Sequence, residues 1–371
     1  MRRWLLPEHI EDVLPAEARA IERLRRAILD LFERHGYELV APPLLEYVES
    51  LLSGTGKDLD LATFKLVDRL SGRMMGVRAD HTPQVARIDA HLLNRQGVAR
   101  LCYCGSVLHT LPAGLTRTRE PLQIGAELYG HAGPEADVEV VRLMIDALKA
   151  ARIERVHVDL GNPAIYRALA ADHASDAEEA EALFHAVQQK NAAEAKGLAV
   201  LTGLHGDLGT IQRARDTLAK KPAVTAALDA LERLAKAVEG PGVDLSVDLS
   251  ELGGFNYESG LVFAAFAAGS PDALARGGRY DEVGASFGRA RPATGFTMDL
   301  RQLAGLAPGN GKRSAILAPC LDDPALNAEI ARLRDAGEVV VVALPGHEDA
   351  EAELGCDRKL EKKDGKWRAT S

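Results

Sequence analysis

The sequence of 371 residues predicts an α+β fold built on an antiparallel sheet. Its strand-like segments are joined mostly by turns and irregular connections, whereas a doubly wound parallel sheet needs a crossover helix between successive strands. Two long segments, 15–34 and 134–151, have the apolar periodicity of helices that cover a sheet. A third stretch, from 164 to about 239, is rich in Ala, Glu, Leu and Lys with few β-branched residues, and we expect it to form a helical insertion.

The first half of the chain supplies most of the expected strands. Gly36 ends the first helix, and Thr82-Pro83 begins another, with a side-chain acceptor at the cap and proline at the first helical position. Alternating or β-branched segments predict strands at 37–41, 63–67, 74–77, 100–107, 120–129 and 156–160.

The second half predicts strands at 243–249 and 260–267, followed by a glycine-rich segment, 276–281. Loop residues at 307–311 indicate a linker, after which strand, helix and strand follow at 314–318, 324–336 and 339–344. We therefore expect three regions: a core over 1–162 and 243–306, a helical insertion over 163–242, and a small C-terminal α/β domain over 313–371.

The overall charge disfavours a chain whose main role is to bind nucleic acid. Lys and Arg total 45 against 54 Asp and Glu, a formal net charge of −9. We find no uncharged apolar run of the roughly 18 residues that a membrane span needs. The apolar run in Met1–Pro7 is too short for a signal peptide. A cytoplasmic protein with no membrane partner is expected.

The four cysteines do not form a disulfide framework in a chain of this length. Cys102 and Cys104 share one face of a predicted strand, but no second ligand pair stands at matched spacing. We expect buried free thiols and no metal site.

The segment 120–129 is the most informative strand. Apolar side chains alternate with polar or small ones, so that one face carries Leu122, Ile124, Ala126 and Leu128 and the other Gln123, Gly125, Glu127 and Tyr129. Gly125 would open a notch between an amide and a carboxylate about 13 Å apart. Such a floor suits a small polar ligand such as an amino acid, but the pattern also fits an ordinary exposed sheet face. Asp80 and Thr82 likewise fit a turn and a helix cap.

Several motifs resemble those of histidyl-tRNA synthetases. Residues 64–73 and 77–82 (VRADHT) are similar to that family's F-x-D-x-x-G and R-P-E-x-T region, and 37–46 to motif 1, which builds its dimer interface. Residues 103–130 are similar to motif 2, and 277–281 with 292–296 to the approach to motif 3. The resemblance spans roughly residues 10–305 and implies a class II synthetase-like antiparallel sheet flanked by helices.

The departures concern ATP activation. His109 and Leu111 stand where motif 2 of a synthetase has arginine and glutamate, and Gln302 stands where motif 3 has arginine. Asp299 replaces a glycine of that motif. Arginine grips phosphate oxygens bidentately and keeps its charge, which neither histidine nor glutamine does at pH 7. The resemblance therefore implies no catalytic residue here, and the C-terminal part, which is short and not notably basic, implies no tRNA partner.

With both these matches and these departures, the sequence resembles the family of ATP phosphoribosyltransferase regulatory subunits. This resemblance implies a non-catalytic role in the first step of histidine biosynthesis, in a hetero-oligomer with a short-form catalytic subunit. It also implies feedback inhibition by L-histidine as effector, and homodimerisation through 37–46. A histidine–tRNA ligase and a free-standing histidine-sensing protein are the alternatives.

The resemblance also implies which residues bind histidine, and it implies no cofactor. The histidine-binding candidates are Asp80, Thr82, Gln123, Glu127, Tyr257 and Tyr280.

Overall fold

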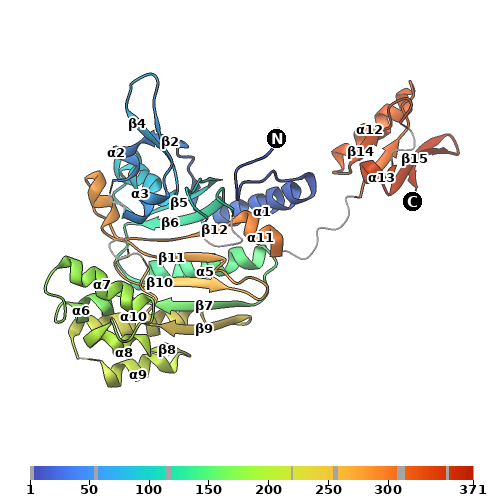
Figure 1. The fold of residues 1–371 in the computed structure, drawn as a ribbon. Helices are drawn as coiled ribbons and strands as arrows, with labels where there is room; N and C mark the ends of the chain where they lie inside the picture. The colour runs from blue at the N-terminus through green and yellow to red at the C-terminus, as the bar shows by residue number, and fades with distance from the viewer. Residues whose placement is uncertain are drawn as a thin grey trace. The chain divides into compact units, whose positions relative to one another are not determined.

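The computed structural model describes residues 4–53, 57–112, 118–218, 220–253, 258–306, 314–347 and 351–370. The chain divides into two compact units, one up to Pro308 and one from Gly309 (Figure 1). The linker predicted at 307–311 lies outside the described residues.

A nine-stranded sheet forms the centre of the first unit. Its order is β1 (Glu38–Leu39), β5 (Ala99–Ser106), β6 (Leu122–Tyr129), β12 (Ala293–Asp299), β11 (Ala275–Arg279), β10 (Val262–Phe266), β7 (Val156–Gly161), β9 (Val243–Asp248) and β8 (His205–Gly206). Neighbours pair antiparallel except β1 with β5 and β7 with β9. The prediction of an α+β fold on a largely antiparallel sheet is confirmed.

One face of this sheet is covered by helices α1 (Pro15–Arg34), α5 (Pro134–Ala150) and α11 (Leu300–Leu306). The predicted apolar face of β6 lies on this side, with Ile124, Ala126 and Leu128 buried in the main core. Cys102 joins the same core as a free thiol, and Cys104 is partly buried beside it.

The opposite face carries the alternate side chains of the same strands. Leu101 and Tyr103 of β5 and Tyr129 of β6 form a second apolar cluster with helix α4 (Thr82–Arg87) and the 3-10 helix η3 (Val283–Phe287). A π-helical turn, η1 (Ile88–Leu93), follows α4 directly. A one-residue change of strand register would exchange the two faces, so the alternation decides which side chains are available for binding.

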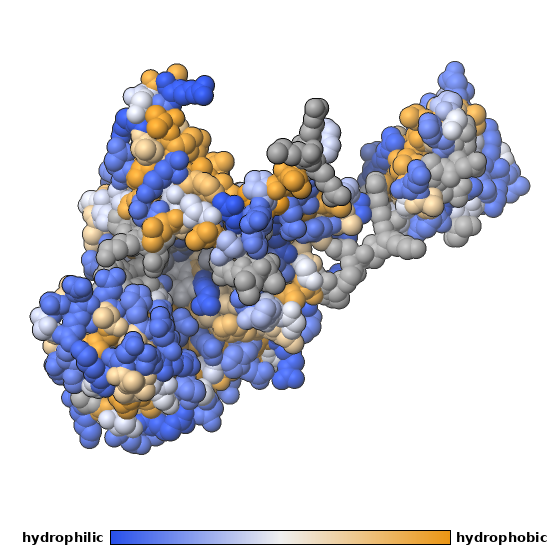
Figure 2. Space-filling view, in the orientation of Figure 1, coloured by the Kyte–Doolittle hydropathy of each residue, from blue (hydrophilic) through white to orange (hydrophobic). Residues whose placement is uncertain are grey.

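A second, three-stranded sheet contains β2 (Leu45–Tyr47), β4 (Met74–Val77) and β3 (Lys65–Val67), accompanied by helices α2 (Val48–Leu51) and α3 (Lys57–Ala62). Figure 2 shows apolar surface over this sheet. Its exposed apolar side chains include Leu45, Leu66, Val67 and Met74, and Leu70 at the β3–β4 turn is 98% exposed.

Helices fill most of the chain between β7 and β9, apart from the short strand β8. They are α6 (Pro163–Ala170), α7 (Ala177–Gln188), η2 (Lys196–Leu198), α8 (Ala199–Thr202), α9 (Gly209–Thr217) and α10 (Pro222–Val238). Side chains of Asn162 and Asp176 cap the first two of these helices. Helix α10 packs on α5, α6 and α9, which places the segment in the same compact unit as the sheet.

The second unit has a four-stranded sheet in the order β14 (Val340–Val342), β13 (Ile316–Ala318), β15 (Arg358–Lys363) and β16 (Lys366–Thr370), with helices α12 (Pro324–Asp335) and α13 (Glu351–Leu354). The hairpin of β15 and β16 was not predicted. Its residues are mostly charged, and of β15 only Leu360 is buried, so the sequence shows little alternation.

No helix within the described ranges has both the length and the apolar character to span a bilayer. Over the same residues, no cluster of three or more His, Cys, Asp or Glu side chains has the arrangement of a metal site.

Candidate functional site

A buried carboxylate, that of Glu127, lies at the centre of the second face of the large sheet. Glu127 is only 1% exposed. One carboxylate oxygen accepts hydrogen bonds from Thr82 Oγ1 at 3.1 Å and Tyr103 OH at 3.2 Å, and the other accepts one from the Tyr280 hydroxyl. Burial raises the pKa of Glu127 to about 8, although the hydrogen bonds from Tyr280, Thr82 and Tyr103 oppose that rise.

A cavity of about 160 Å³ opens beside this carboxylate. Its lining residues are Asp80, Thr82, Glu127, Glu258, Arg276, Gly277, Gly278, Tyr280, Gly295, Phe296 and Thr297. The described lining contains three carboxyl groups, those of Asp80, Glu127 and Glu258, and one guanidinium, that of Arg276. This charge pattern suits a ligand that has hydrogen-bond donors or positive charge at one part and one carboxylate at another.

Glycine is required on the strand beside Glu127. Gly295 of β12 pairs directly with Glu127 of β6, and a Cβ at Gly295 would overlap the Glu127 carboxylate. Gly278 of β11 pairs with Gly295 in turn, so two paired positions on adjacent central strands lack side chains at the cavity. The open space therefore lies over β11 and β12.

The notch predicted at Gly125 is not open. Tyr103 lies opposite Gly125 in the β5–β6 pairing, and its hydroxyl occupies the place that a Gly125 Cβ would take. The tyrosine thus separates Gln123 from Glu127, and the predicted continuous floor between them was wrong. The alternative of an ordinary exposed sheet face is also wrong, because Glu127 is fully enclosed.

Gln123 lies at the edge of the site, where its amide contacts Asp80 and His81. Its Nε2 donates to Asp80 Oδ1 at 3.1 Å, and its Oε1 lies 2.8 Å from His81 Nδ1. Gln123 lines an adjoining cavity of about 110 Å³ instead of the main one. Asp80 lines the main cavity and is thereby linked to Gln123.

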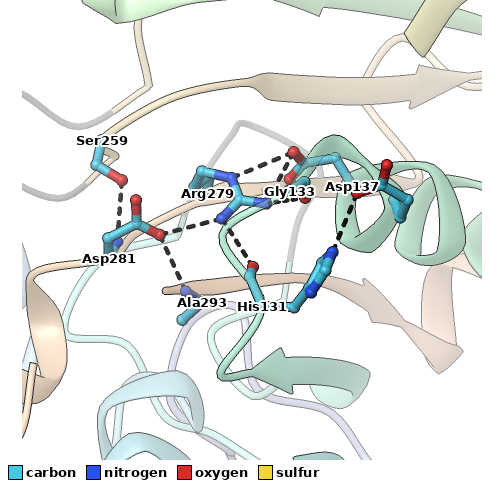
Figure 3. Close-up of polar contacts among 8 residues, drawn as sticks. His131, Gly133, Asp137, Ser259, Arg279, Asp281 and Ala293 are labelled. Carbon is cyan, nitrogen blue, oxygen red and sulfur yellow. Dashed lines mark hydrogen bonds and ion pairs between the residues drawn. The ribbon is translucent and has the colours of Figure 1, made fainter. Parts of the chain in front are cut away.

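Tyr280 is held in place by its neighbours on the chain. Arg279 is buried and donates to Asp137 Oδ2 at 2.9 and 3.2 Å, and to Asp281 Oδ1 at 3.3 Å (Figure 3). The same Asp281 oxygen accepts from the Ala293 amide at 3.0 Å, which ties the end of β11 to the start of β12. These contacts fix the backbone on both sides of Tyr280 and direct its hydroxyl to Glu127.

The adjoining cavity contains three of the positions at which the motif resemblance predicts departures from the ATP-binding motifs of synthetases. His109, Asp299 and Gln302 line it, and within the part of the chain that the structure describes Arg276 is its one lining arginine or lysine. The Gln302 amide donates to Ser270 Oγ at 3.0 Å, and His109 Nε2 lies 2.9 Å from the Ala79 carbonyl oxygen. These side chains are engaged with the protein itself.

Arg301 does not replace the missing arginine of motif 3. It lies next to Gln302 in sequence, but its guanidinium pairs with Glu120 at 3.5 Å, and it does not line either cavity. Leu111 is 75% exposed.

Four of the six predicted binding residues therefore line one cavity: Asp80, Thr82, Glu127 and Tyr280. Gln123 lies beside them, and Tyr257 lies outside the described residues. Sequence reasoning missed His81, Tyr103, Glu258 and Arg276. For Tyr103 the available signal was its place between Cys102 and Cys104 on a predicted strand, but its role depends on the register of β5 with β6.

Comparison with known proteins identifies the family. A family model described as histidyl-tRNA synthetase matches residues 9–303, and one described as the ATP phosphoribosyltransferase subunit HisZ C-terminal domain matches 313–370. Proteins named ATP phosphoribosyltransferase regulatory subunit are similar over almost the whole chain. That of Burkholderia cenocepacia is 54% identical with 99% of each chain covered, and that of Cupriavidus taiwanensis is 56% identical with 98% covered.

Solved structures agree with this assignment. A Bacillus halodurans protein, described as an ATP phosphoribosyltransferase regulatory subunit/histidyl-tRNA synthetase, superposes with a TM-score of 0.82 at 26% identity, covering 96% of this chain and 97% of that one. Histidyl-tRNA synthetase from Nostoc shares the fold, with a TM-score of 0.77 at 17% identity and coverage of 100% and 97%. The chain belongs to the family of ATP phosphoribosyltransferase regulatory subunits.

Proposed function

We propose that this chain is a non-catalytic regulatory subunit that activates a separate short-form ATP phosphoribosyltransferase and confers inhibition by L-histidine. One observation carries the proposal: an acidic pocket around Glu127 adjoins a second cavity whose described lining has His109 and Gln302 where the family resemblance expects phosphate-binding arginines. The molecule keeps what an amino acid needs for binding and lacks what activation of that amino acid needs.

Histidine suits the main cavity chemically. Its ammonium and imidazole groups supply donors for Glu127 and Asp80, and its carboxylate would meet Arg276, the one cation among the described lining residues. The raised pKa of Glu127 indicates that the empty pocket holds this group largely protonated at pH 7. A cationic ligand would favour its ionised form. We include Tyr257 among the binding residues on the strength of the family resemblance alone.

A ligase function requires phosphate contacts that the described residues of the second cavity do not offer. Each charge-assisted hydrogen bond contributes about 1.5–3 kcal/mol, so loss of two arginines is severe. Arg276 is shared between the cavities, and one guanidinium cannot serve both an amino-acid carboxylate and a triphosphate. We therefore propose that the chain neither activates histidine nor binds tRNA, and that it acts in the cytoplasm.

Reconstitution tests the proposed function. The catalytic subunit from the same organism should gain phosphoribosyl-ATP synthesis when this chain is added, and histidine should then inhibit that activity. Glu127→Ala should preserve activation and remove inhibition. A catalytic subunit that is equally active and equally histidine-sensitive alone would contradict the proposal. A free-standing sensor would bind histidine but change nothing in the partner's turnover.

We further propose a homodimer through residues 37–46. Strand β1 lies at the edge of the large sheet and pairs only with β5. Leu39 on β1, Leu44, and Leu45 at the start of β2 are each 40–57% exposed, and Pro42-Pro43 lies in the connection between the two strands. An exposed edge with apolar side chains is suited to pairing with a second copy.

Light scattering of the eluted protein tests the dimer. Leu45→Asp should convert a dimer into a monomer, because it places a charge in an apolar contact. Val200→Asp, on helix α8, is the control: Val200 is similarly exposed, at 37%, and the dimer should persist. A monomeric wild-type chain at micromolar concentration would contradict the proposal.

A further inference from the structure

We infer that His81 and Arg78 are positioning residues of the pocket, which hold the Gln123 amide in one orientation toward Asp80. The inference rests on the proposed function, because it names residues that set the histidine affinity of the same site. Both side chains are enclosed: His81 is 1% exposed and Arg78 is 7% exposed. Neither lines the two cavities, so any effect on a ligand is transmitted through Gln123 and Asp80.

The first step is the orientation of the glutamine. Gln123 Oε1 lies 3.2 Å from the His81 backbone nitrogen, which donates to it, and 2.8 Å from His81 Nδ1. The same backbone nitrogen also donates to Asp80 Oδ1 at 2.8 Å. With Oε1 directed to His81, the Gln123 amide nitrogen is directed to Asp80, 3.1 Å away. An amide has one acceptor end and one donor end, so these partners select one of its two rotations.

The second step is the state of the imidazole. Burial and the charge of Arg78 lower the pKa of His81 to about 4, so the ring is neutral at pH 7. A neutral imidazole has one N–H, and Gln123 Oε1 can only accept. The proton therefore belongs on Nδ1, and the lone pair is on Nε2.

The third step is what Nε2 faces. A Cβ at Gly105 would lie 2.5 Å from Arg78 Nη2 and 3.0 Å from His81 Nε2, which places both nitrogens around the same small space. A guanidinium there favours a lone pair on Nε2 and so reinforces the proton on Nδ1. Gly105 is needed because any side chain would displace Arg78.

Arg78 is itself fixed from two sides. Its Nε donates to the Ser106 carbonyl and its Nη1 to the Pro42 carbonyl, each at 2.8 Å. Hydrogen bonds thus hold Arg78 to Pro42, in the segment that we propose for the dimer, and link His81 and Gln123 to Asp80 in the cavity, while Arg78 acts on His81 through its charge. The His81 ring also stacks on Tyr103 at 4.7 Å between centroids, and Tyr103 donates to Glu127.

Two substitutions separate the hydrogen bond from the stacking. His81→Phe keeps a ring against Tyr103 but removes the donor to Gln123. His81→Asn loses the ring but places an amide N–H near the Nδ1 position. Calorimetric titration with histidine should show affinity reduced about 5- to 30-fold for His81→Phe and within about threefold of wild type for His81→Asn.

A double substitution tests whether His81 acts through Gln123. Gln123→Ala should itself weaken histidine binding, and adding His81→Phe to it should change the affinity by less than about twofold. Additive losses would overturn the inference, as would the reverse ranking of His81→Phe and His81→Asn. Thermal unfolding of each variant serves as the folding control.

If His81→Phe does not fold, Arg78→Lys carries the test. A lysine has one nitrogen and cannot hold Pro42 and Ser106 while facing His81, so histidine affinity should fall about 3- to 10-fold. Unchanged histidine affinity in Arg78→Lys would overturn the inference.

Failure of the proposed function can be told apart from failure of this inference. A wild-type chain that binds no histidine contradicts the proposed function. Binding that Glu127→Ala abolishes, but His81→Phe and Arg78→Lys preserve, contradicts only the role of these two residues.

Discussion

The two adjoining cavities share Arg276 and Thr297 but differ in what surrounds them. Beside the main cavity the buried carboxyl group of Glu127 accepts three hydrogen bonds, one of them from Tyr280, whose backbone is fixed on both sides. Around the other, Gln302 and His109 are bonded to the protein's own Ser270 and Ala79. The comparison teaches that two cavities sharing one arginine can differ in their polar groups: around the first they converge on a buried carboxyl group, and around the second they bond to the protein's own backbone and side chains.

The largest expected effect is on the main cavity. Glu127→Ala removes the carboxylate on which Thr82, Tyr103 and Tyr280 converge, and should weaken histidine binding about 10- to 150-fold. Glu135→Gln is the matched control, because that carboxylate is 76% exposed and bonded to His131 away from the cavity. Titration calorimetry measures both. Wild-type affinity in Glu127→Ala would mean that histidine binds elsewhere.

A smaller effect concerns stability and pH. Because the pKa of Glu127 rises to about 8 in the folded chain, folding takes up a proton between its ordinary value near 4.5 and pH 8. The proton bound by Glu127 therefore stabilises the folded chain at low pH, and this contribution to the free energy of unfolding is lost as pH rises through 8. The lowered pKa of His81 acts in the opposite direction, but only below about pH 6.5.

Between pH 6.5 and 8, Glu127 is therefore the one of these two groups whose contribution to stability changes with pH. Wild-type stability in the absence of histidine should fall there by about 1–2 kcal/mol more than that of Glu127→Gln, which cannot titrate. Urea unfolding at several pH values measures this difference. Parallel curves for the two proteins would show that Glu127 is already ionised in the empty pocket.

The last prediction is that His109→Arg has no effect on activity or on histidine binding. His109→Arg returns one cation to the second cavity but leaves Gln302 and the carboxylate of Asp299 in place. Histidine-dependent pyrophosphate exchange should stay at background, and histidine binding should stay near the wild-type value. Exchange above background would show that the second cavity had lost less than its residues indicate.

Sequence reasoning succeeded where periodicity is local. The alternation over 122–129 predicted which side chains of β6 enter the core, and Thr82-Pro83 predicted the start of α4. It failed where contacts depend on strand pairing. Tyr103 fills the space at Gly125 because β5 and β6 pair in one register, and Gly295 makes room for Glu127 because β12 lies on the other side. Neither neighbour can be read from β6 alone.

The glycines of β11 and β12 have an energetic consequence. Each glycine inside a strand costs about 0.5–1 kcal/mol relative to alanine, and Gly277, Gly278 and Gly295 all lie beside the cavity. A Cβ at any of the three would come within 3 Å of a neighbouring atom, so β11 and β12 bear this entropic cost beside the cavity. Backbone amides of these two strands should exchange with deuterium faster in the empty chain than in the histidine-bound chain, so that effector concentration sets the local rigidity of the sheet.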